Sequence, residues 1–188
     1  MRPSTLMVGD HQKTNLHLSG EVFYDELTQL PNHKHVTKYL KDMLGEGRED
    51  PQVALCMIEI DYFKRYNDFH GHLEGEHCLQ QVANCMKTVM NNRQGILGRF
   101  NGEEFVCFLM DMNAEEFAQF AETLREAVEH LSLLFCWEQH SFQMTISVGG
   151  VHGFWSQFKD KSEMLSIAAE ELYKATSTGR NNVKINFK

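Results

Sequence analysis

Arg99-Phe100-Asn101-Gly102-Glu103-Glu104-Phe105 is the most informative stretch of this 188-residue chain, and apolar runs flank it on both sides. Asn-Gly between such runs predicts a β-hairpin with a two-residue turn, in which both central residues have positive φ. Asparagine tolerates this conformation and glycine adopts it without steric cost. We therefore expect Asn101 and Gly102 to form the turn, and Glu103 and Glu104 to begin the next strand on opposite faces. Taken alone, the stretch is more simply interpreted as a surface hairpin carrying a solvated acidic pair.

A second informative feature is the apolar run at residues 53–60, which is interrupted only by Glu59. Such a run predicts a strand buried on both faces. A carboxylate near the end of a buried strand is costly unless a partner compensates its charge. Asp61 follows directly, and we expect it to cap a helix that runs through Lys64 and Asn67.

Periodicity predicts the remaining elements. Helical spacing of apolar residues indicates helices near residues 36–43, 76–90, 117–131 and 161–176, and alternation indicates strands at 142–148, with one buried face, and at 183–187. Gly71 and Gly75 are expected to interrupt the chain before the second of these helices. This order is that of a ferredoxin-like split βαβ fold, an α+β arrangement with a mainly antiparallel sheet flanked by helices. In such a fold the end of the first strand lies beside the hairpin, so Glu59 and Glu103 should meet at one edge of the sheet.

Length and composition limit the class of protein. The length is that of one domain, and we assign residues 1–22 to a tail or linker and residues 23–188 to the folded domain. The formal net charge of -8 argues against nucleic-acid binding, but not against a nucleotide whose charge a divalent cation neutralises. No apolar run has membrane-spanning length, and the first residues lack a signal-peptide segment. Five cysteines without a CxxC pair indicate reduced thiols, so we expect a cytoplasmic protein.

The paired carboxylates suggest a chemistry. Two neighbouring carboxylates repel each other unless a proton or a cation separates them. Hard oxygen ligands favour Mg²⁺ or Mn²⁺, and phosphoryl transfer needs such a metal together with positive charge at the phosphates. Lys64 and Arg180 can supply that charge, so the residues indicate metal-assisted phosphoryl or nucleotidyl transfer. His70, His72 and His77 raise the alternative of a transition-metal site, but without a cysteine pair at ligand spacing we favour solvated or nucleotide-facing histidines.

Five motifs, in order and with suitable spacing, resemble those of the GGDEF domain, the catalytic module of diguanylate cyclases. The resemblance covers about residues 23 to 188 and rests on DELTQLPN, IEIDYFKRYNDFHGHLEGE, RFNGEEF, TISVGG and ELYKATSTGRN. It implies a nucleotidyl-cyclase palm fold, in which two GTP-loaded domains face each other and form cyclic di-GMP with release of pyrophosphate.

The resemblance also implies roles for individual residues at the metal and the phosphates. Glu59 and Glu103 match metal-binding carboxylates, and the backbone carbonyl of Ile60 matches a further ligand of Mg²⁺ or Mn²⁺. Glu103 also matches the position that helps to deprotonate the attacking ribose 3′-hydroxyl. Lys64 matches a residue that stabilises phosphate charge, and Arg180 matches a phosphate contact.

The base and the ribose are assigned in the same way. Asn67, His72 and Glu76 match positions that hold the guanine and its ribose. Asn101 and Gly102 match the signature turn that approaches the nucleotide. The partners implied are GTP and a second copy of the domain, met in a transient homodimer.

The chain departs from the family pattern at several positions. Glu59 and Glu76 replace the usual aspartates and lengthen each arm by one methylene, which affects the metal geometry and the distance to the base. Asn101 replaces the first glycine of the signature, and Thr176 stands where a phosphate-binding lysine is common. The product-inhibition motif RxxD would fall on residues 92–95 and is absent. The departures support an alternative, in which a catalytically weak GGDEF-like module binds GTP or a protein partner without turnover.

Overall fold

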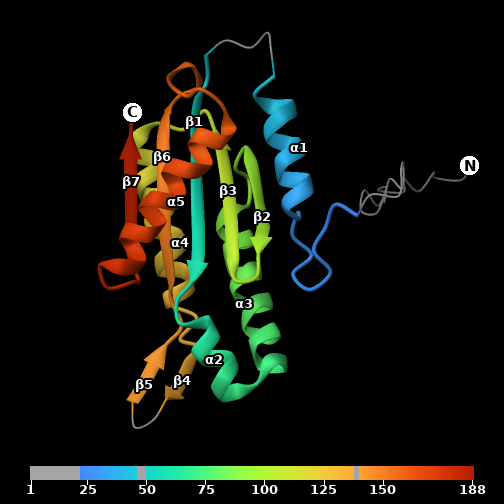
Figure 1. The fold of residues 1–188 in the computed structure, drawn as a ribbon, viewed down its shortest axis with the longest axis vertical. Helices are drawn as coiled ribbons and strands as arrows, with labels where there is room; N and C mark the ends of the chain where they lie inside the picture. The colour runs from blue at the N-terminus through green and yellow to red at the C-terminus, as the bar shows by residue number, and fades with distance from the viewer. Residues whose placement is uncertain (1–21, 46–49, 138–139) are drawn as a thin grey trace, which may run out of the picture.

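The computed structural model describes residues 22–45, 50–137 and 140–188. The predicted tail, except for Val22, lies outside these residues. Within them the chain forms α1 (His33–Met43), β1 (Gln52–Ile60), α2 (Phe63–His70), α3 (His72–Met90), β2 (Gly95–Asn101), β3 (Glu104–Met110), α4 (Ala114–Glu129), β4 (Leu134–Trp137), β5 (His140–Gln143), β6 (Ile146–Phe154), the 3-10 helix η1 (Trp155–Gln157), α5 (Lys161–Ser177) and β7 (Val183–Phe187) (Figure 1).

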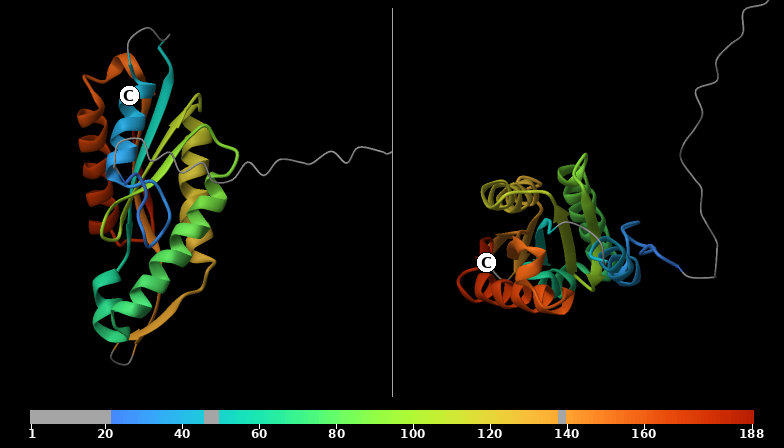
Figure 2. Two further views of the ribbon diagram at one scale, coloured as in Figure 1. Left: turned by 90° about the vertical axis from the view of Figure 1, so that its right-hand side faces the viewer. Right: turned by 90° about the horizontal axis from the view of Figure 1, so that it is seen from above.

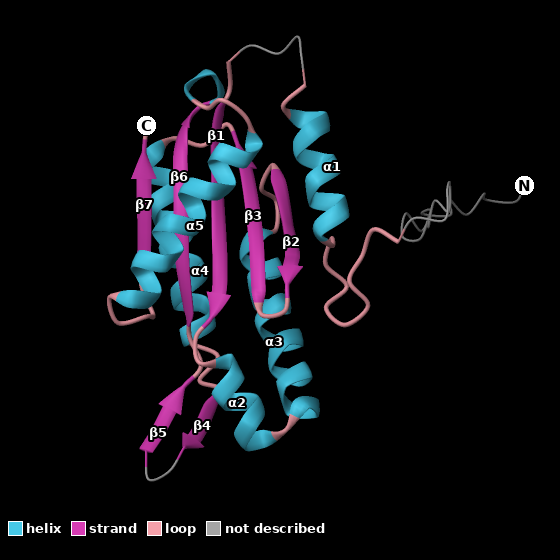
Figure 3. Ribbon diagram, viewed as in Figure 1, coloured by secondary structure: helices cyan, strands magenta, loops and turns pink. Residues whose placement is uncertain are grey.

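The central sheet has the strand order β2-β3-β1-β6-β7. Its pairs are antiparallel except for β6 and β7, which run parallel. β4 and β5 form a separate two-stranded sheet below the central one (Figure 3). The predicted α+β fold with a mainly antiparallel sheet is therefore confirmed.

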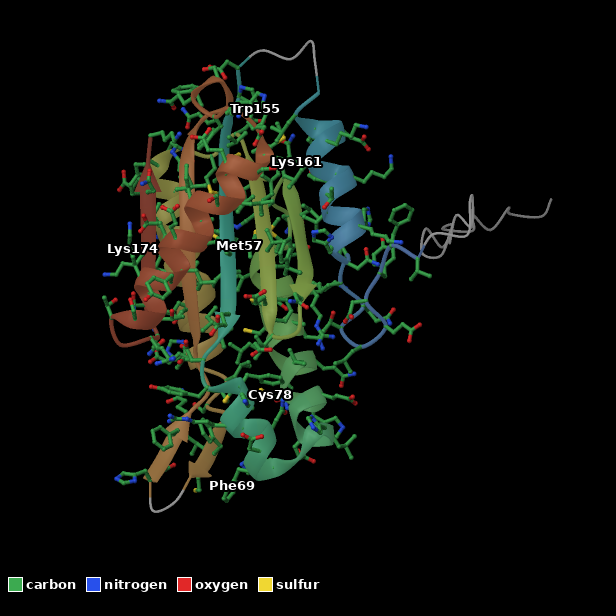
Figure 4. All side chains as sticks on the ribbon, in the orientation of Figure 1. Met57, Phe69, Cys78, Trp155, Lys161 and Lys174 are labelled. Atoms are coloured by element: carbon green, nitrogen blue, oxygen red, sulfur yellow. The ribbon has the colours of Figure 1, made fainter. Side chains whose placement is uncertain are left out.

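Helices cover both faces of the central sheet: α3 and α4 lie on one face, and α1 and α5 on the other (Figure 2). Successive β1 side chains enter the two cores in turn. Cys56 and Ile58 pack with α3 and α4, whereas Leu55 and Met57 pack with α1 and α5 (Figure 4 labels Met57). Because both faces are covered, β1 is apolar almost throughout, as the run at residues 53–60 predicts.

The hairpin prediction is wrong by one residue. Asn101 pairs with Glu104, so the two turn residues are Gly102, with φ 45°, and Glu103. The register shifts between Arg99 and Asn101, which makes Phe100 an extra, bulged residue. The bulge moves the turn one position along the chain, and Glu103 therefore lies in the turn rather than in β3.

Two helix predictions are also corrected. Asp61 does not cap α2, because the N-cap is Tyr62, which has φ 57° and makes no side-chain capping hydrogen bond. α3 begins at His72 rather than near Glu76 and continues through Gly75. A Cβ atom on Gly75 would lie 1.7 Å from Oδ1 of Asn67, so this glycine allows α2 and α3 to approach closely and does not break the helix.

The strand expected at residues 142–148 is in fact divided. β5 ends at Gln143 and pairs with β4, whereas β6 begins at Ile146 in the central sheet. β6 is buried on both faces, not on one, although Thr145 before it and Ser147 within it are polar. Their hydroxyl groups are buried because they donate hydrogen bonds to Asp61.

Other expectations hold. The helices α1, α4 and α5 and the strand β7 form close to the predicted ranges. The described cysteines are free thiols, and Cys56, Cys78 and Cys107 are buried. Burial raises the pKa of Cys78 to about 12, so it remains protonated near neutral pH. No described helix combines the length and apolar character needed to cross a membrane.

Candidate active site

Three segments lie at the lower end of the central sheet: the end of β1, the β2–β3 turn on one side of it, and the turn between α5 and β7 on the other (Figure 1). The amide of Ile60 donates a hydrogen bond of 3.2 Å to the carbonyl of Glu103, which attaches the hairpin turn to β1. Glu59 lies opposite Glu104 in the β1–β3 ladder. The predicted meeting of the β1 end with the hairpin is therefore present.

Glu59 is half-buried in a strongly negative environment. Burial raises the pKa of its carboxyl group. Repulsion from neighbouring carboxylates raises the pKa further, in the order Glu104, Asp61 and Glu103, and the positive charge of Arg180 opposes this. An excess of carboxylates at a half-buried position is the environment that a bound cation relieves.

The donor set fits a hard divalent cation that is only partly held by protein. Within the described ranges, no three or more His, Cys, Asp and Glu side chains form a complete metal-binding group. Mg²⁺ keeps waters and shares substrate phosphates, so one or two carboxylates are its usual protein ligands. Glu59, Glu103 and the carbonyl oxygen of Ile60 suit such an ion.

Arg180 is held near these carboxylates by the turn after α5. Its guanidinium carbon lies 4.5 Å from the centre of the Tyr62 ring, a cation–π contact. Arg180 and Asn181 have positive φ values of 63° and 45°, and Gly179 has φ 116°. Consecutive left-handed residues are costly and persist only where the surrounding structure holds them.

The remaining predicted residues lie on the α2–α3 corner and on the hairpin. Lys64 is exposed in the first turn of α2, and His72 and Glu76 are exposed at the start of α3. Asn67 of α2 faces Gly75, and its side-chain oxygen is buried without a hydrogen-bond partner. A buried amide oxygen without a donor is uncommon in folded proteins.

The exposed Asn101 and Gly102 line a hollow of about 640 Å³ between the hairpin and the segment before α1. Beneath them, Arg99 donates to the carbonyl of Gly102 and, at 3.1 Å, to the carboxylate of Asp25. Burial raises the pKa of Asp25, but hydrogen bonds from Thr28 and Arg99 outweigh it, so the net pKa is lowered. The Asp25–Arg99 pair thus supports the turn that carries Glu103.

The sequence interpretation missed Asp61 as a structural centre of this site. Its carboxylate accepts hydrogen bonds from Thr145 Oγ1, Ser147 Oγ and the amide of Asn181. A visible signal was present, since Thr145 and Ser147 alternate with apolar residues that are buried. Hydroxyl groups on a strand that is otherwise almost entirely buried indicate a buried polar partner.

Comparison with known proteins agrees with the geometry. The family described as "Diguanylate cyclase, GGDEF domain" matches residues 22–182. The chain is 30% identical over 186 residues to uncharacterized protein YhcK of Bacillus subtilis, and 29% identical over 148 residues to diguanylate cyclase A of Treponema denticola. The matches cover 95% and 79% of this chain but 51% and 39% of those proteins, so the chain spans about half their length or less. An uncharacterized relative from Staphylococcus epidermidis, 30% identical over 164 residues (87% of this chain, 46% of that protein), is named a membrane protein.

Solved structures of GGDEF-domain proteins have a similar fold. The GGDEF domain of DgcB from Caulobacter crescentus, in complex with c-di-GMP, matches with a TM-score of 0.78 and 26% identity over 90% of this chain and 98% of that one. Diguanylate cyclase SiaD from Pseudomonas aeruginosa, in complex with its activator SiaC, matches with a TM-score of 0.75 and 25% identity over 87% and 62%. Since the family match spans most of the described chain and the folds agree, this chain belongs to the GGDEF-domain family.

Proposed function

We propose that this chain is a diguanylate cyclase that condenses two GTP molecules into cyclic di-GMP and releases pyrophosphate. The observation that carries the proposal is the excess of carboxylates at the end of β1, where Glu59 has Glu104, Asp61 and Glu103 as like-charged neighbours and Arg180 as an opposing charge. Family membership and the relative named diguanylate cyclase A support it. A GTP-dependent reaction also favours a cytoplasmic location for the domain.

The chain's own residues have distinct tasks in this reaction. Glu59, Glu103 and the Ile60 carbonyl would hold Mg²⁺ or Mn²⁺, which neutralises triphosphate charge when it is bound. Glu103 helps to remove the proton from the attacking ribose 3′-hydroxyl. Lys64 and Arg180 stabilise negative charge on the phosphates.

The α2–α3 corner is the proposed base site. Asn67 offers an amide, and the Glu76 carboxylate can accept two hydrogen bonds from the N1-H and 2-amino groups of guanine. Adenine lacks that donor pair and would leave the carboxylate unpaired, at a cost of roughly a few kcal/mol. His72 contacts the ribose, and Asn101 with Gly102 borders the nucleotide at the hairpin. GTP should therefore be preferred to ATP.

Incubation of the purified protein with GTP and Mg²⁺ or Mn²⁺, followed by mass analysis, tests the proposal. Cyclic di-GMP and pyrophosphate are expected, with little cyclic product from ATP. The absence of cyclic di-GMP with both metals, at high protein concentration, would contradict it.

Two GTP molecules need two sites that face each other, and a two-fold axis provides them through one type of interface. We expect a transient homodimer, so the rate per mole of protein should rise roughly linearly with concentration while dimer is scarce. Initial rates across a dilution series at saturating GTP measure this. A constant specific activity in protein shown to be monomeric by light scattering would exclude the face-to-face mechanism.

A second candidate is a weakly active module that binds GTP or a protein partner. The longer arms of Glu59 and Glu76, together with Asn101 and Thr176, favour it. In the structure Thr176 donates to the carbonyl of Tyr173 and supplies no positive charge. GTP binding without product in the same assay would select this candidate.

A further inference from the structure

Asp61 is the most enclosed charged side chain near the site, with 0% of its surface exposed. Its Oδ1 accepts from Ser147 Oγ at 2.7 Å, and its Oδ2 accepts from Thr145 Oγ1 at 2.6 Å and from the amide of Asn181 at 3.0 Å. Burial of a carboxylate is strongly unfavourable unless such donors replace water. The three donors come from the β5–β6 connection, from β6 and from the turn after α5, so one carboxylate joins segments far apart in the chain.

The hydrogen bond from the Asn181 amide to Asp61 also affects the position of Arg180, because Asn181 follows Arg180 in the left-handed turn. Other contacts in this turn are local or at its far side: Arg180 N donates to Ala175 O at 3.1 Å, and Arg125 donates to Asn181 Oδ1 at 2.8 Å. Among the described residues, the bond to Asp61 ties the backbone of the turn to the end of β1, the amide of Val148 ties the turn to β6 through Asn182 O at 3.0 Å, and the Arg180 side chain lies against the Tyr62 ring. The bond to Asp61 therefore fixes the backbone next to Arg180 relative to Glu59, two residues before Asp61.

We propose that Asp61 is a positioning residue of the nucleotide site: its buried carboxylate holds the Gly179–Asn181 turn against β1 and thereby aims Arg180 at the phosphates of a bound nucleotide. Asp61 is not itself a metal ligand, since it is fully enclosed and its oxygens are engaged by protein donors. The identity of the ligand rests on the proposed function, whereas the holding of the turn does not.

Amide hydrogen exchange in the absence of nucleotide tests the first half of the proposal. Asp61→Ala should speed exchange of the Asn181 amide by about tenfold or more, because the amide loses its acceptor. Ser166→Ala, at an exposed serine on α5, serves as the control and should leave this exchange unchanged. If Asp61→Ala fails to fold, Asp61→Leu fills more of the space, removes the acceptor and carries the same measurement. Unchanged exchange at Asn181 in a folded variant would overturn the proposal.

Binding of 3′-deoxy-GTP, which lacks the attacking hydroxyl, tests the second half by calorimetry. Asp61→Ala and Arg180→Ala should each weaken binding about tenfold, and the double variant should be no weaker than Arg180→Ala. If the double variant binds 3′-deoxy-GTP about a hundredfold more weakly than the unaltered protein, the two losses are independent. Asp61 would then not act through Arg180, which would overturn the proposal. If the unaltered protein does not bind the analogue, the proposed function fails, and the exchange result alone decides whether Asp61 holds the turn.

Discussion

Glu59 and Asp61 lie two residues apart at the end of β1, yet their surroundings are opposite. Asp61 is completely buried and receives three hydrogen bonds from protein donors. Glu59 is half-buried and surrounded by other carboxylates, with Arg180 as the opposing charge. The more buried carboxylate is thus the better satisfied one.

The difference separates Asp61, a structural carboxylate, from Glu59, which we propose to be a metal ligand. A buried charge with enough donors holds segments together, and its loss leaves those donors unpaired. A carboxylate among like charges destabilises the fold through electrostatic repulsion. A cation that binds there relieves the repulsion, and this relief favours binding of the cation. Burial alone would have singled out Asp61 rather than Glu59.

The largest effect is expected at Glu103, which we propose to hold the metal together with Glu59. Glu103→Gln keeps the size of the side chain but removes the charge that attracts the metal and the proton. Turnover should fall by about 100-fold or more, with little change in thermal unfolding, since Glu103 lies in a turn. Initial rates of cyclic di-GMP formation measure this, with Glu115→Gln on the exposed start of α4 as the control. An unchanged turnover number would refute the assignment of Glu103.

The next prediction sets the two carboxylates against each other in stability. Without divalent ions, Asp61→Ala should lower the free energy of unfolding by about 2–4 kcal/mol, because buried donors lose their acceptor. Glu59→Gln should leave the unfolding free energy unchanged or raise it by up to about 1 kcal/mol, because it relieves repulsion. Urea unfolding measures both.

Added Mg²⁺ sharpens the same comparison, because it should raise the melting temperature of the unaltered protein and not that of Glu59→Gln. Equal losses of stability in the two variants would remove the distinction between them.

A smaller effect is expected at Asp25. Like Asp61, its carboxylate accepts hydrogen bonds from protein donors, here Thr28 and Arg99, but it is nearer the surface. Asp25→Asn weakens the bond to Arg99 and should cost about 1 kcal/mol at neutral pH. The pKa of Asp25 is lowered in the folded state, so its contribution is complete above the unfolded value near 3.8. The contribution is lost as the pH falls through the pKa that Asp25 has in the folded state. The unfolding free energies of the unaltered protein and of Asp25→Asn should become equal there. A stability difference that grows on acidification would contradict this sign.

The smallest effect is expected when cyclic di-GMP, the product of the proposed reaction, is added to the rate assay. The positions of the RxxD motif are occupied by residues 92–95, and Arg93 is already engaged: its guanidinium lies 4.8 Å from the Phe120 ring, and its Nε donates to Val89 O. We expect micromolar cyclic di-GMP to leave the initial rate almost unchanged. Strong non-competitive inhibition would show that another surface binds the product.

Much of the architecture could be predicted from local patterns. The continuous apolar run of β1 indicated a strand covered on both faces, and the helical spacing in α3 and α4 indicated their buried sides, because periodicity reports burial directly. The order of elements then brought the end of β1 to the hairpin, and with it Glu59 to Glu103. These residues determine a mainly antiparallel sheet with a carboxylate pair at one edge.

The tertiary structure alone decided the roles of polar groups whose partners are distant in the chain. Asp61 was expected to cap the next helix, but its partners are 84, 86 and 120 residues away. Gly75 was expected to break a helix, but it provides space for Asn67 on a neighbouring one. A sequence pattern shows which side chains are buried, whereas the donors that satisfy a buried charge are chosen by the packing of segments that no local pattern connects.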